Sequence, residues 1–527
     1  MSFITWQYFL FLPLIFVLYW QLPPRLRLPL LLIASYFFYA CWDVRFLALV
    51  LTTTVIDYIC GLSLGGRRLK PAWVLILALL PGAWLGVCYL LLTSWGQATP
   101  LLIAVAGGLG VAFFAIHEGV WAWGGEKRNK GLLILSVGFC LAILGFFKYF
   151  NFFVDSAQNL LGHMGLQANF VLLHIILPVG ISFYTFQSLG YVIDVYRRTS
   201  PACADFLTFA TFDAFFPQMV SGPIERGKNL IPQLEGVGIF QNSYVHDGLR
   251  LILVGLFKKV FVADNCAVIA GYVFDPRTAL TAPWAILGVV AFAFQIYGDF
   301  SGYTDIARGS AKLLGINLME NFRFPYFARN PSDFWSRWHI SLSTWFRDYV
   351  YIPLGGNRGS QWDTIRNLAV TMLLAGLWHG ANWIFVIWGA YHGALLILYR
   401  FVPPFTGFMA KEKKGRGLQW MAAALMFLFT LAGWAIFRSA NLAQLGQWFA
   451  ALGHWQAGAV PWQKSALWLL FHIVPLLLLQ ALTWKQGDEA GGLERLPWPV
   501  RGLLYTALLL LVVSSSEQDQ EFIYFQF

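Results

Sequence analysis

Long apolar runs separated by short polar segments dominate this sequence. An apolar run of about 18 residues can cross the ~30 Å hydrocarbon core of a membrane as an α-helix. The alternation expected of β-barrel strands is not visible, and helices are the other way to satisfy backbone hydrogen bonds in lipid. The pattern therefore predicts an all-α polytopic membrane protein. The predicted spans are residues 5–22, 28–42, 46–65, 71–94, 100–124, 131–153, 168–195, 247–273, 281–303, 366–383, 384–402, 418–438, 464–484 and 499–514.

Two regions interrupt this pattern. Residues 204–235 are only moderately apolar, and residues 304–365 place many charged side chains among aromatic residues and prolines. Polar backbone at membrane depth is tolerated only when it is buried in protein or lines a cavity. We therefore expect re-entrant and amphipathic helices on the cytoplasmic side here, and we expect the functional residues to lie near them.

Composition supports the membrane assignment and limits the choice of partners. Hydrophobic residues make up 58% of the chain and charged residues 12%, whereas soluble domains carry about 25% charged residues. The net charge of +10 is not spread as a nucleic-acid surface would be, because Lys and Arg occur in short clusters between apolar runs. Such clusters mark cytoplasmic loops, and residues 439–463, which lack Lys and Arg, are predicted outside. The clusters are Arg67, Arg68 and Lys70; Lys127, Arg128 and Lys130; Arg197 and Arg198; and Lys411, Lys413, Lys414 and Arg416.

Two further features bear on processing and redox chemistry. The first apolar run, Trp6 to Trp20, has no basic segment before it and no small-residue cleavage site after it, so it is interpreted as a retained span. The six cysteines are scattered without a C-x-x-C pair, which predicts neither a zinc site nor a disulfide framework. No bound metal or cofactor is expected.

The histidine in Leu377-Trp378-His379-Gly380-Ala381-Asn382 is the strongest candidate for chemistry. It follows Arg366 in a predicted span and would lie about 20 Å deeper at 1.5 Å per residue. An ionisable group at that depth is costly and indicates function, and burial favours the neutral imidazole, which is a base. The alternative is a core histidine that is hydrogen-bonded to a neighbouring helix.

A second histidine, His339, lies in the polar stretch as Arg337-Trp338-His339, and both rings could meet in one cavity. An interfacial histidine among snorkelling neighbours is the alternative interpretation. Trp378, Asn382, Arg337 and Trp338 are candidates for the cavity wall, and His392 in the next span is a candidate neighbour.

Two other segments are weaker candidates. Tyr303 and Asp305 end a predicted span and could orient the histidine region, although Asp305 could equally pair with Arg308 or Arg337. The run Gly355, Gly356, Asn357 and Arg358 could contact a phosphate or pantetheine group of a donor, but such runs are more often turns.

The motifs of other mechanisms are missing from the sequence. There is no G-x-S-x-G elbow of a serine hydrolase and no H-E-x-x-H pair of a zinc hydrolase. Direct transfer assisted by a histidine base fits the residues that are present. A transporter would instead predict inverted repeats and intramembrane charges along a pathway, and a scaffold without chemistry is a further alternative.

Several ordered motifs resemble the membrane-bound O-acyltransferase (MBOAT) family, and within it most closely the membrane subunit of bacterial alginate O-acetylation. The motifs are Pro178-Val179-Gly180-Ile181-Ser182-Phe183-Tyr184, Tyr191-Val192-Ile193-Asp194-Val195-Tyr196, Gly255-Leu256-Phe257-Lys258-Lys259-Val260, Gly298-Asp299-Phe300-Ser301-Gly302-Tyr303, Arg337-Trp338-His339-Ile340-Ser341-Leu342-Ser343, Leu354-Gly355-Gly356-Asn357-Arg358-Gly359 and the His379 motif.

The resemblance implies that His379 is the catalytic histidine and His339 the second characteristic site. It also implies an MBOAT-type ring of transmembrane and re-entrant helices around a central cavity. The expected organisation is N-terminal transmembrane helices at 1–130, a catalytic core at 131–440, and C-terminal helices and tail at 441–527. Residues 71–124 look like a two-helix insertion into the first of these.

The function implied is acetyl transfer from a cytoplasmic thioester, acetyl-CoA or another acyl thioester, at the bacterial inner membrane. The product would be O-acetylation of an exported polysaccharide, with a periplasmic SGNH-like acyltransferase or a polysaccharide-modification complex as partner and membrane lipid around the chain. D-Alanyl transfer to a cell-envelope polymer is the alternative within the family.

Overall fold

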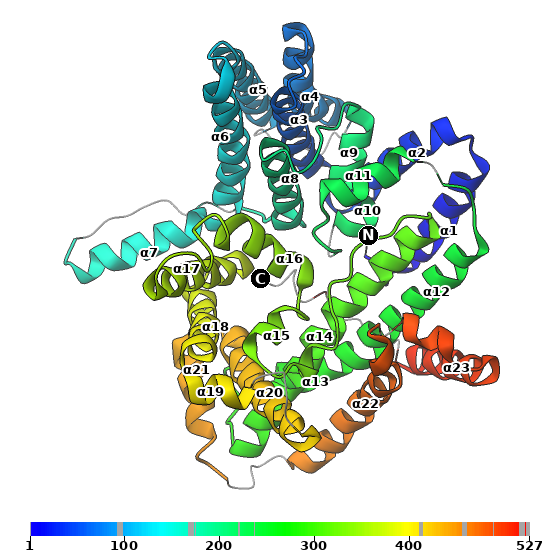
Figure 1. Ribbon diagram of the computed structural model, residues 1–527, viewed down its shortest axis with the longest axis vertical. Helices are drawn as coiled ribbons and strands as arrows, with labels where there is room; N and C mark the ends of the chain where they lie inside the picture. Colours follow the sequence, from blue (N-terminus) through cyan, green and yellow to red (C-terminus); the bar gives the residue numbers. More distant parts are fainter. Residues whose placement is uncertain are drawn as a thin grey trace. The chain divides into compact units, whose positions relative to one another are not determined.

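The computed structural model describes residues 2–91, 99–166, 173, 175–219, 222–236, 238–409, 415–455, 461–488, 490–515 and 522 (Figure 1). All regular elements among these residues are helices. The described chain forms two compact units, one of residues 1–244 with 310–318, the other of residues 245–309 with 319–527. Lys411, Lys413 and Lys414 of the predicted cytoplasmic cluster and residues 456–460 of the predicted outer segment lie outside the described residues.

The first unit is built from helices that carry the N-terminal apolar runs. A 3-10 turn at Val44–Phe46 and a π-helical segment at Gly145–Tyr149 join some of them. The helices are α1 (Trp6–Gln21), α2 (Pro24–Asp43), α3 (Leu47–Leu64), α4 (Pro71–Leu91), α5 (Thr99–Trp121), α6 (Gly125–Leu144), α7 (Phe150–His163), α8 (Ile181–Tyr196), α9 (Phe206–Ala214), α10 (Phe216–Met219) and α11 (Gly227–Glu235).

The two helices predicted as an insertion, α4 and α5, pack closely on each other. A Cβ atom at Gly110 would lie 2.3 Å from the carbonyl oxygen of Ala78, so only glycine allows this approach. The Gly108–Gly110 segment is therefore a helix-packing feature. That residues 71–124 are an insertion relative to the family that the sequence resembles stays a prediction.

The second unit holds both candidate histidines. Helix α12 enters it from the first unit, and the end of α14 returns to the first unit. Its elements are α12 (Asn242–Leu256), a π-helix (Phe257–Ala263), α13 (Asp264–Val273), α14 (Ala282–Leu313), a 3-10 turn (Pro325–Phe327), α15 (Pro331–Trp335), α16 (Ile340–Phe346), a π-helix (Arg347–Tyr351), α17 (Gln361–His379), α18 (Trp383–Phe401), α19 (Pro403–Met409), α20 (Arg416–Arg438), α21 (Leu442–Ala451), α22 (Trp462–Thr483), 3-10 turns (Trp484–Gln486 and Gly491–Arg495) and α23 (Trp498–Ser514).

Helices α17 and α18 form a tight hairpin through facing glycines. A Cβ atom at Gly376 would lie 2.2 Å from the carbonyl oxygen of Phe385, and one at Gly389 would lie 2.3 Å from that of Met372. The backbones approach so closely that the residue at the end of α17 is held against α18. A capping box at Ser360 and Asp363 fixes the other end of α17.

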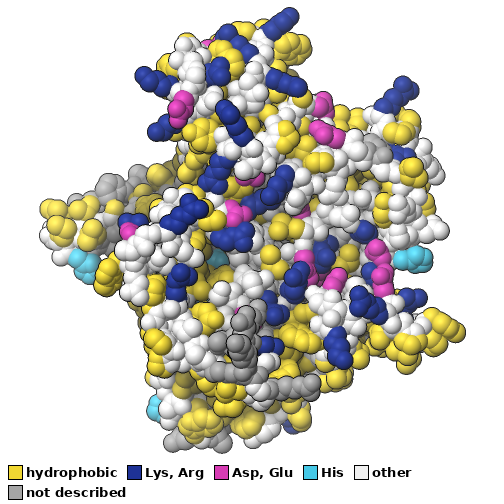
Figure 2. Space-filling view, viewed as in Figure 1, with side chains coloured by type: hydrophobic (Ala, Val, Ile, Leu, Met, Phe, Trp, Pro, Cys, Tyr) yellow, Lys and Arg dark blue, Asp and Glu magenta, His cyan; other side chains and the backbone are white. Residues whose placement is uncertain are grey.

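Eight helices in the described chain are long and apolar enough to cross a membrane, which confirms a multi-pass membrane protein. Large apolar side chains also cover much of the surface, as expected when lipid is the solvent (Figure 2). The predicted spans at 366–383 and 384–402 correspond to the helices α17 and α18. Of these two, only α18 is among the helices that are long and apolar enough to cross a membrane.

Two predicted boundaries are wrong for clear reasons. The span predicted at 168–195 is represented by α8, which begins only at Ile181, because Pro178 and a left-handed Gly180 with φ of +76° precede it. The helix predicted to end at residue 303 continues to Leu313, since Asp305 and Arg308 pair within it instead of breaking it. The division at residues 130 and 440 and the ring around a central cavity stay predictions.

Candidate active site

His379 is the last residue of α17, and a sharp connection fixes it there. Gly380 continues in extended backbone, and a Cβ atom on it would lie 2.2 Å from the Phe385 ring. Asn382 then caps α18 by accepting a hydrogen bond from the amide of Ile384 at 3.0 Å. The three residues between the helices therefore turn the chain without room to shift the histidine.

Aromatic rings surround the His379 imidazole. Trp378, Trp388 and Phe437 lie 5.0, 4.9 and 5.3 Å from it between ring centroids, all with their planes steeply inclined. These rings come from α17, α18 and α20. Rings from three helices therefore enclose the imidazole and hold its orientation.

His339 precedes α16 in a conformation that L-residues rarely adopt, with φ of +43°. Such backbone persists only when its surroundings over-determine it, and it is often found at functional sites. Its ring contacts Phe300 of α14 at 4.7 Å and Trp378 at 5.8 Å between centroids. Trp378 thus contacts both histidines and brings the two motifs together, whereas a cavity shared by the two rings stays a prediction.

Asn321 sets the tautomer of His339. Its Oδ1 atom accepts hydrogen bonds from the backbone amide of Ser341 at 3.1 Å and from the Ser341 hydroxyl at 2.9 Å. A backbone amide can only donate, so the Asn321 atom must be the carbonyl oxygen. The Nδ1 atom of His339, 3.1 Å from the same oxygen, is therefore the protonated nitrogen, and Nε2 carries the lone pair.

Both histidine side chains are buried, to slightly different degrees. His339 is 0% exposed, and this burial lowers its pKa to about 3, so it is neutral at physiological pH. His379 keeps 4% of its surface exposed. Both rings are therefore buried, with His379 slightly less enclosed than His339.

Trp338 and Arg337 lie beside the site with structural contacts. The Trp338 ring packs on Trp434 at 4.8 Å and on Phe322 at 5.0 Å between centroids. Arg337 pairs with Asp333 at 2.9 Å and lies over the Trp484 ring at 5.6 Å. Trp338 therefore supports the aromatic layer next to His339, and Arg337 fixes the loop that carries it.

Tyr303 and Asp305 belong to a buried ionic cluster on α14 and the π-helix Phe257–Ala263. Asp305 pairs with Lys258 at 2.7 Å and with Arg308 at 3.3 Å, which confirms the alternative of structural pairing with Arg308. Lys259 pairs with Asp264 at 2.7 Å and Asp299 at 2.9 Å. The Lys259 ammonium also lies 5.7 Å from the centroid of the Tyr303 ring. Lys258 and Lys259 both lie in the π-helix Phe257–Ala263, and π-helical segments frequently occur at functional sites.

The glycine-rich run is not brought to the histidines. Gly355, Gly356, Asn357 and Arg358 form the turn that leads into the first residue of α17, and Tyr351 donates a hydrogen bond to Asn357 there. His379 is at the opposite end of that helix, about 27 Å away along its axis. Asn382 is exposed and caps α18.

Several residues of the site were not singled out from the sequence. Asn321 lies in an unremarkable polar segment, and Trp388 and Phe437 are aromatic residues in a chain that is 17% aromatic. Lys258 and Lys259 did offer a signal, because two charges lay inside a predicted span. The described residues contain no group of three or more His, Cys, Asp or Glu side chains that could hold a metal ion.

Comparison with known proteins identifies the family of this chain. Residues 197–440, which include His339, His379, Asn321 and Trp388, match the model of the membrane-bound O-acyltransferase family. The chain is 40% identical over 445 residues to the probable alginate O-acetylase AlgI of Pseudomonas putida, covering 84% of this chain and 78% of that protein. This chain belongs to the membrane-bound O-acyltransferase family.

More distant members of this MBOAT family are also similar. A peptidoglycan O-acetyltransferase of Helicobacter pylori is 32% identical over 82% of this chain and 76% of its own length. A teichoic acid D-alanyltransferase of Bacillus subtilis is 27% identical over 59% of this chain and 79% of its own length. The protein is a multi-pass membrane O-acyltransferase.

Proposed function

We propose that this MBOAT protein transfers an acetyl group from acetyl-CoA, at the cytoplasmic face of the bacterial inner membrane, to a hydroxyl acceptor that approaches from the opposite face. The observation that supports this most is the position of His379, held between Trp378 and Trp388, with Trp378 also contacting the second histidine, His339. The acetyl assignment is supported by the 40% and 32% identical relatives, a probable alginate O-acetylase and a peptidoglycan O-acetyltransferase.

The proposed reaction needs one base. His379 accepts the proton of the acceptor hydroxyl while the hydroxyl oxygen attacks the thioester carbonyl carbon. The C–O bond forms, the C–S bond breaks, and the thiolate of the donor leaves and takes up a proton. General-base catalysis contributes about 10²–10⁴-fold, and holding both substrates in one site contributes through proximity. His339 and Trp378 position the rings around this site.

We propose that the acetyl group reaches an exported polysaccharide through a periplasmic partner. An SGNH-like acyltransferase or a polysaccharide-modification complex would receive the acetyl group and place it on the polymer. Alginate is the polymer suggested by the similarity to alginate O-acetylases. A second candidate is D-alanyl transfer to a cell-envelope polymer, which the Bacillus subtilis relative suggests.

Substitution of His379 tests the chemistry. With acetyl-CoA and a polysaccharide fragment as hydroxyl acceptor, purified His379→Gln protein in lipid nanodiscs should release CoA thiol at least about 100-fold more slowly than wild type, because it lacks the base. The matched control is His472→Gln. His472 is a buried histidine of the same unit, and its Nδ1 atom bonds the carbonyl oxygen of Trp468 at 2.8 Å within α22.

The outcomes separate the alternatives. Normal turnover by His379→Gln, or equal losses in both variants, would remove the catalytic assignment. Wild-type protein that consumes no acyl thioester would favour a scaffold or transporter. Consumption of a D-alanyl carrier-protein thioester in place of acetyl-CoA would favour the second candidate.

A further inference from the structure

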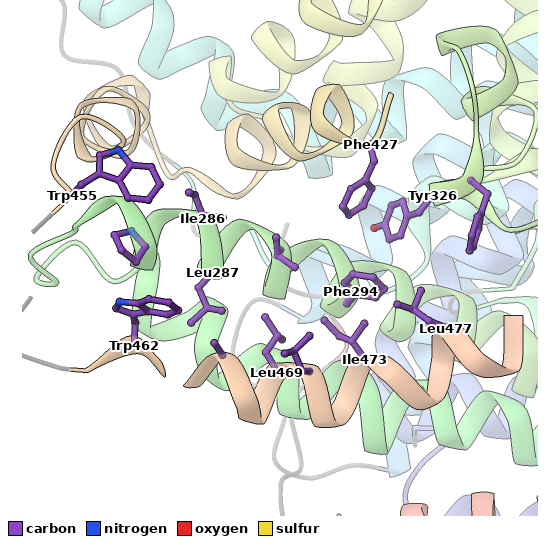
Figure 3. Close-up of a pocket in the computed structure, with 15 residues that line it drawn as sticks. Ile286, Leu287, Phe294, Tyr326, Phe427, Trp455, Trp462, Leu469, Ile473 and Leu477 are labelled. Carbon is purple, nitrogen blue, oxygen red and sulfur yellow. The ribbon is translucent and has the colours of Figure 1, made fainter. Parts of the chain in front are cut away.

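An apolar cavity of about 600 Å³ lies in the second unit between α14, α20 and α22 (Figure 3). Figure 3 shows Leu469, Ile473 and Leu477 facing Leu287 and Phe294 across it. Every lining side chain is apolar or aromatic, and neither histidine is among them. The one hydroxyl, that of Tyr326, already donates a hydrogen bond to the carbonyl oxygen of Ala293. Among the described lining residues, the remaining polar groups are the indole N–H donors of Trp455 and Trp462 at one end, so the rest of the lining suits an apolar ligand.

The cavity has the length of one leaflet. Its wall along α22 runs from Trp462 to Leu477, about 22 Å at 1.5 Å per residue. Half of a ~30 Å hydrocarbon core is about 15 Å, and the headgroup region adds the rest. The cavity is also open at its side, since Leu470 and Ile286 are exposed. A single extended acyl chain that enters from the surrounding lipid matches this shape.

The two ends of the cavity differ in character. Trp455 and Trp462 lie at one end in Figure 3, and tryptophan is enriched where the membrane meets water. One exposed basic residue, Lys464, lies two positions after Trp462 and complements an anionic phosphate. Tyr326 and Phe427 close the other end.

The closed end connects to the active site. The Tyr326 ring stacks on Trp338 at 6.3 Å between centroids, and Trp338 precedes His339 in the chain. Material that fills the cavity therefore supports the aromatic layer behind His339. An empty cavity would leave Tyr326 without packing on one side, and the lining would lose dispersion contacts.

We propose that this cavity binds one acyl chain of a bilayer phospholipid, with the phosphate at the Trp455–Trp462 end. The lipid is a tightly held component that supports Tyr326 and Trp338 and is distinct from the acetyl donor. The site lies outside the histidine cluster, so the proposal does not rest on the acetyl-transfer function.

Photolabelling tests the proposal on the wild-type protein. The protein is placed in nanodiscs of phosphatidylethanolamine and phosphatidylglycerol that contain a phosphatidylethanolamine with a diazirine near the end of one acyl chain. Label should concentrate on peptides that carry Tyr326, Phe427 or Leu477. Label spread evenly over exposed apolar helix faces, such as those of α5 and α23, would overturn the proposal.

A matched pair of variants adds a second readout. Ala466 lines the cavity, whereas the next residue, Leu467, is exposed and does not. Ala466→Trp should reduce cavity labelling and the phospholipid retained in native mass spectrometry at least about fivefold, and Leu467→Trp should change neither. Equal retention by both variants would contradict the proposal. If Ala466→Trp fails to fold, the wild-type labelling map still decides.

Discussion

The second histidine shows how a single amide can determine the chemistry of a neighbouring ring. The backbone amide of Ser341 donates a hydrogen bond to the side-chain oxygen of Asn321. This fixes the amide group of Asn321 so that its oxygen, and not its nitrogen, faces His339. A histidine that takes part in a site must have a fixed tautomer as well as a fixed position. The strained φ of His339 and its complete burial indicate that the surrounding loop is built to hold this one orientation.

The buried state of His339 predicts an acid sensitivity of the fold. Its pKa is about 3 in the folded protein and about 6.5 when unfolded. The unfolded chain therefore binds more protons between these values. The stability from the neutral ring is fully present above pH 6.5 and is lost as the pH falls toward 3. Acidification from pH 7.5 to 5 should lower the free energy of unfolding by about 2 kcal/mol through this residue.

The variant His339→Gln isolates this contribution, because glutamine can still donate a hydrogen bond to Asn321 but does not titrate. Thermal unfolding in detergent at pH 7.5 and pH 5 should show a smaller loss of Tm for the variant than for wild type. An identical loss in both proteins would show that other groups cause the acid sensitivity.

At the scale of elements, the α17–α18 hairpin positions His379, and glycine makes the hairpin possible. Gly376→Ala would place a Cβ atom 2.2 Å from the Phe385 carbonyl oxygen, which is backbone and cannot rotate away. Overpacking of this kind costs about 1–3 kcal/mol. We expect a lower Tm and a loss of activity, because His379 lies less than one turn from Gly376.

Gly446→Ala in α21 is the control for this substitution. No heavy atom lies within 4 Å of the added Cβ, so the change should be neutral or stabilise the helix by about 0.5–1 kcal/mol. Differential scanning fluorimetry and the CoA-release assay compare the two variants. A Gly376→Ala protein as stable and active as Gly446→Ala would mean that the hairpin can separate at no cost.

Helix existence was predictable from apolar periodicity, but contacts between distant residues were not. The runs at 71–94, 281–303 and 418–438 became α4, α14 and α20 with modest boundary errors. The proximity of His339 and His379 was a hypothesis from their rarity at depth. The rings that complete the site, Trp388 and Phe437, resemble many other aromatic residues, so only tertiary packing could identify them.

For the whole molecule, the distribution of basic residues predicts an orientation that labelling can check. The segment with Lys70 is expected in the cytoplasm and the segment with Gly453 outside. In a background where the exposed Cys41 is serine, a membrane-impermeant maleimide added to spheroplasts should label Gly453→Cys and leave Lys70→Cys unlabelled. Lysis should then allow labelling of Lys70→Cys. Labelling of Lys70→Cys alone before lysis would reverse the orientation.

The length of α17 has a consequence for the choice of donor. The glycine-rich turn stands at one end of this helix and His379 at the other, about 27 Å apart. A contact between this turn and the donor stays a prediction. A donor bound there by its phosphates would need an arm of about this length to bring its thioester to His379, and acetyl thioesters of small thiols, which lack such an arm, would then transfer poorly.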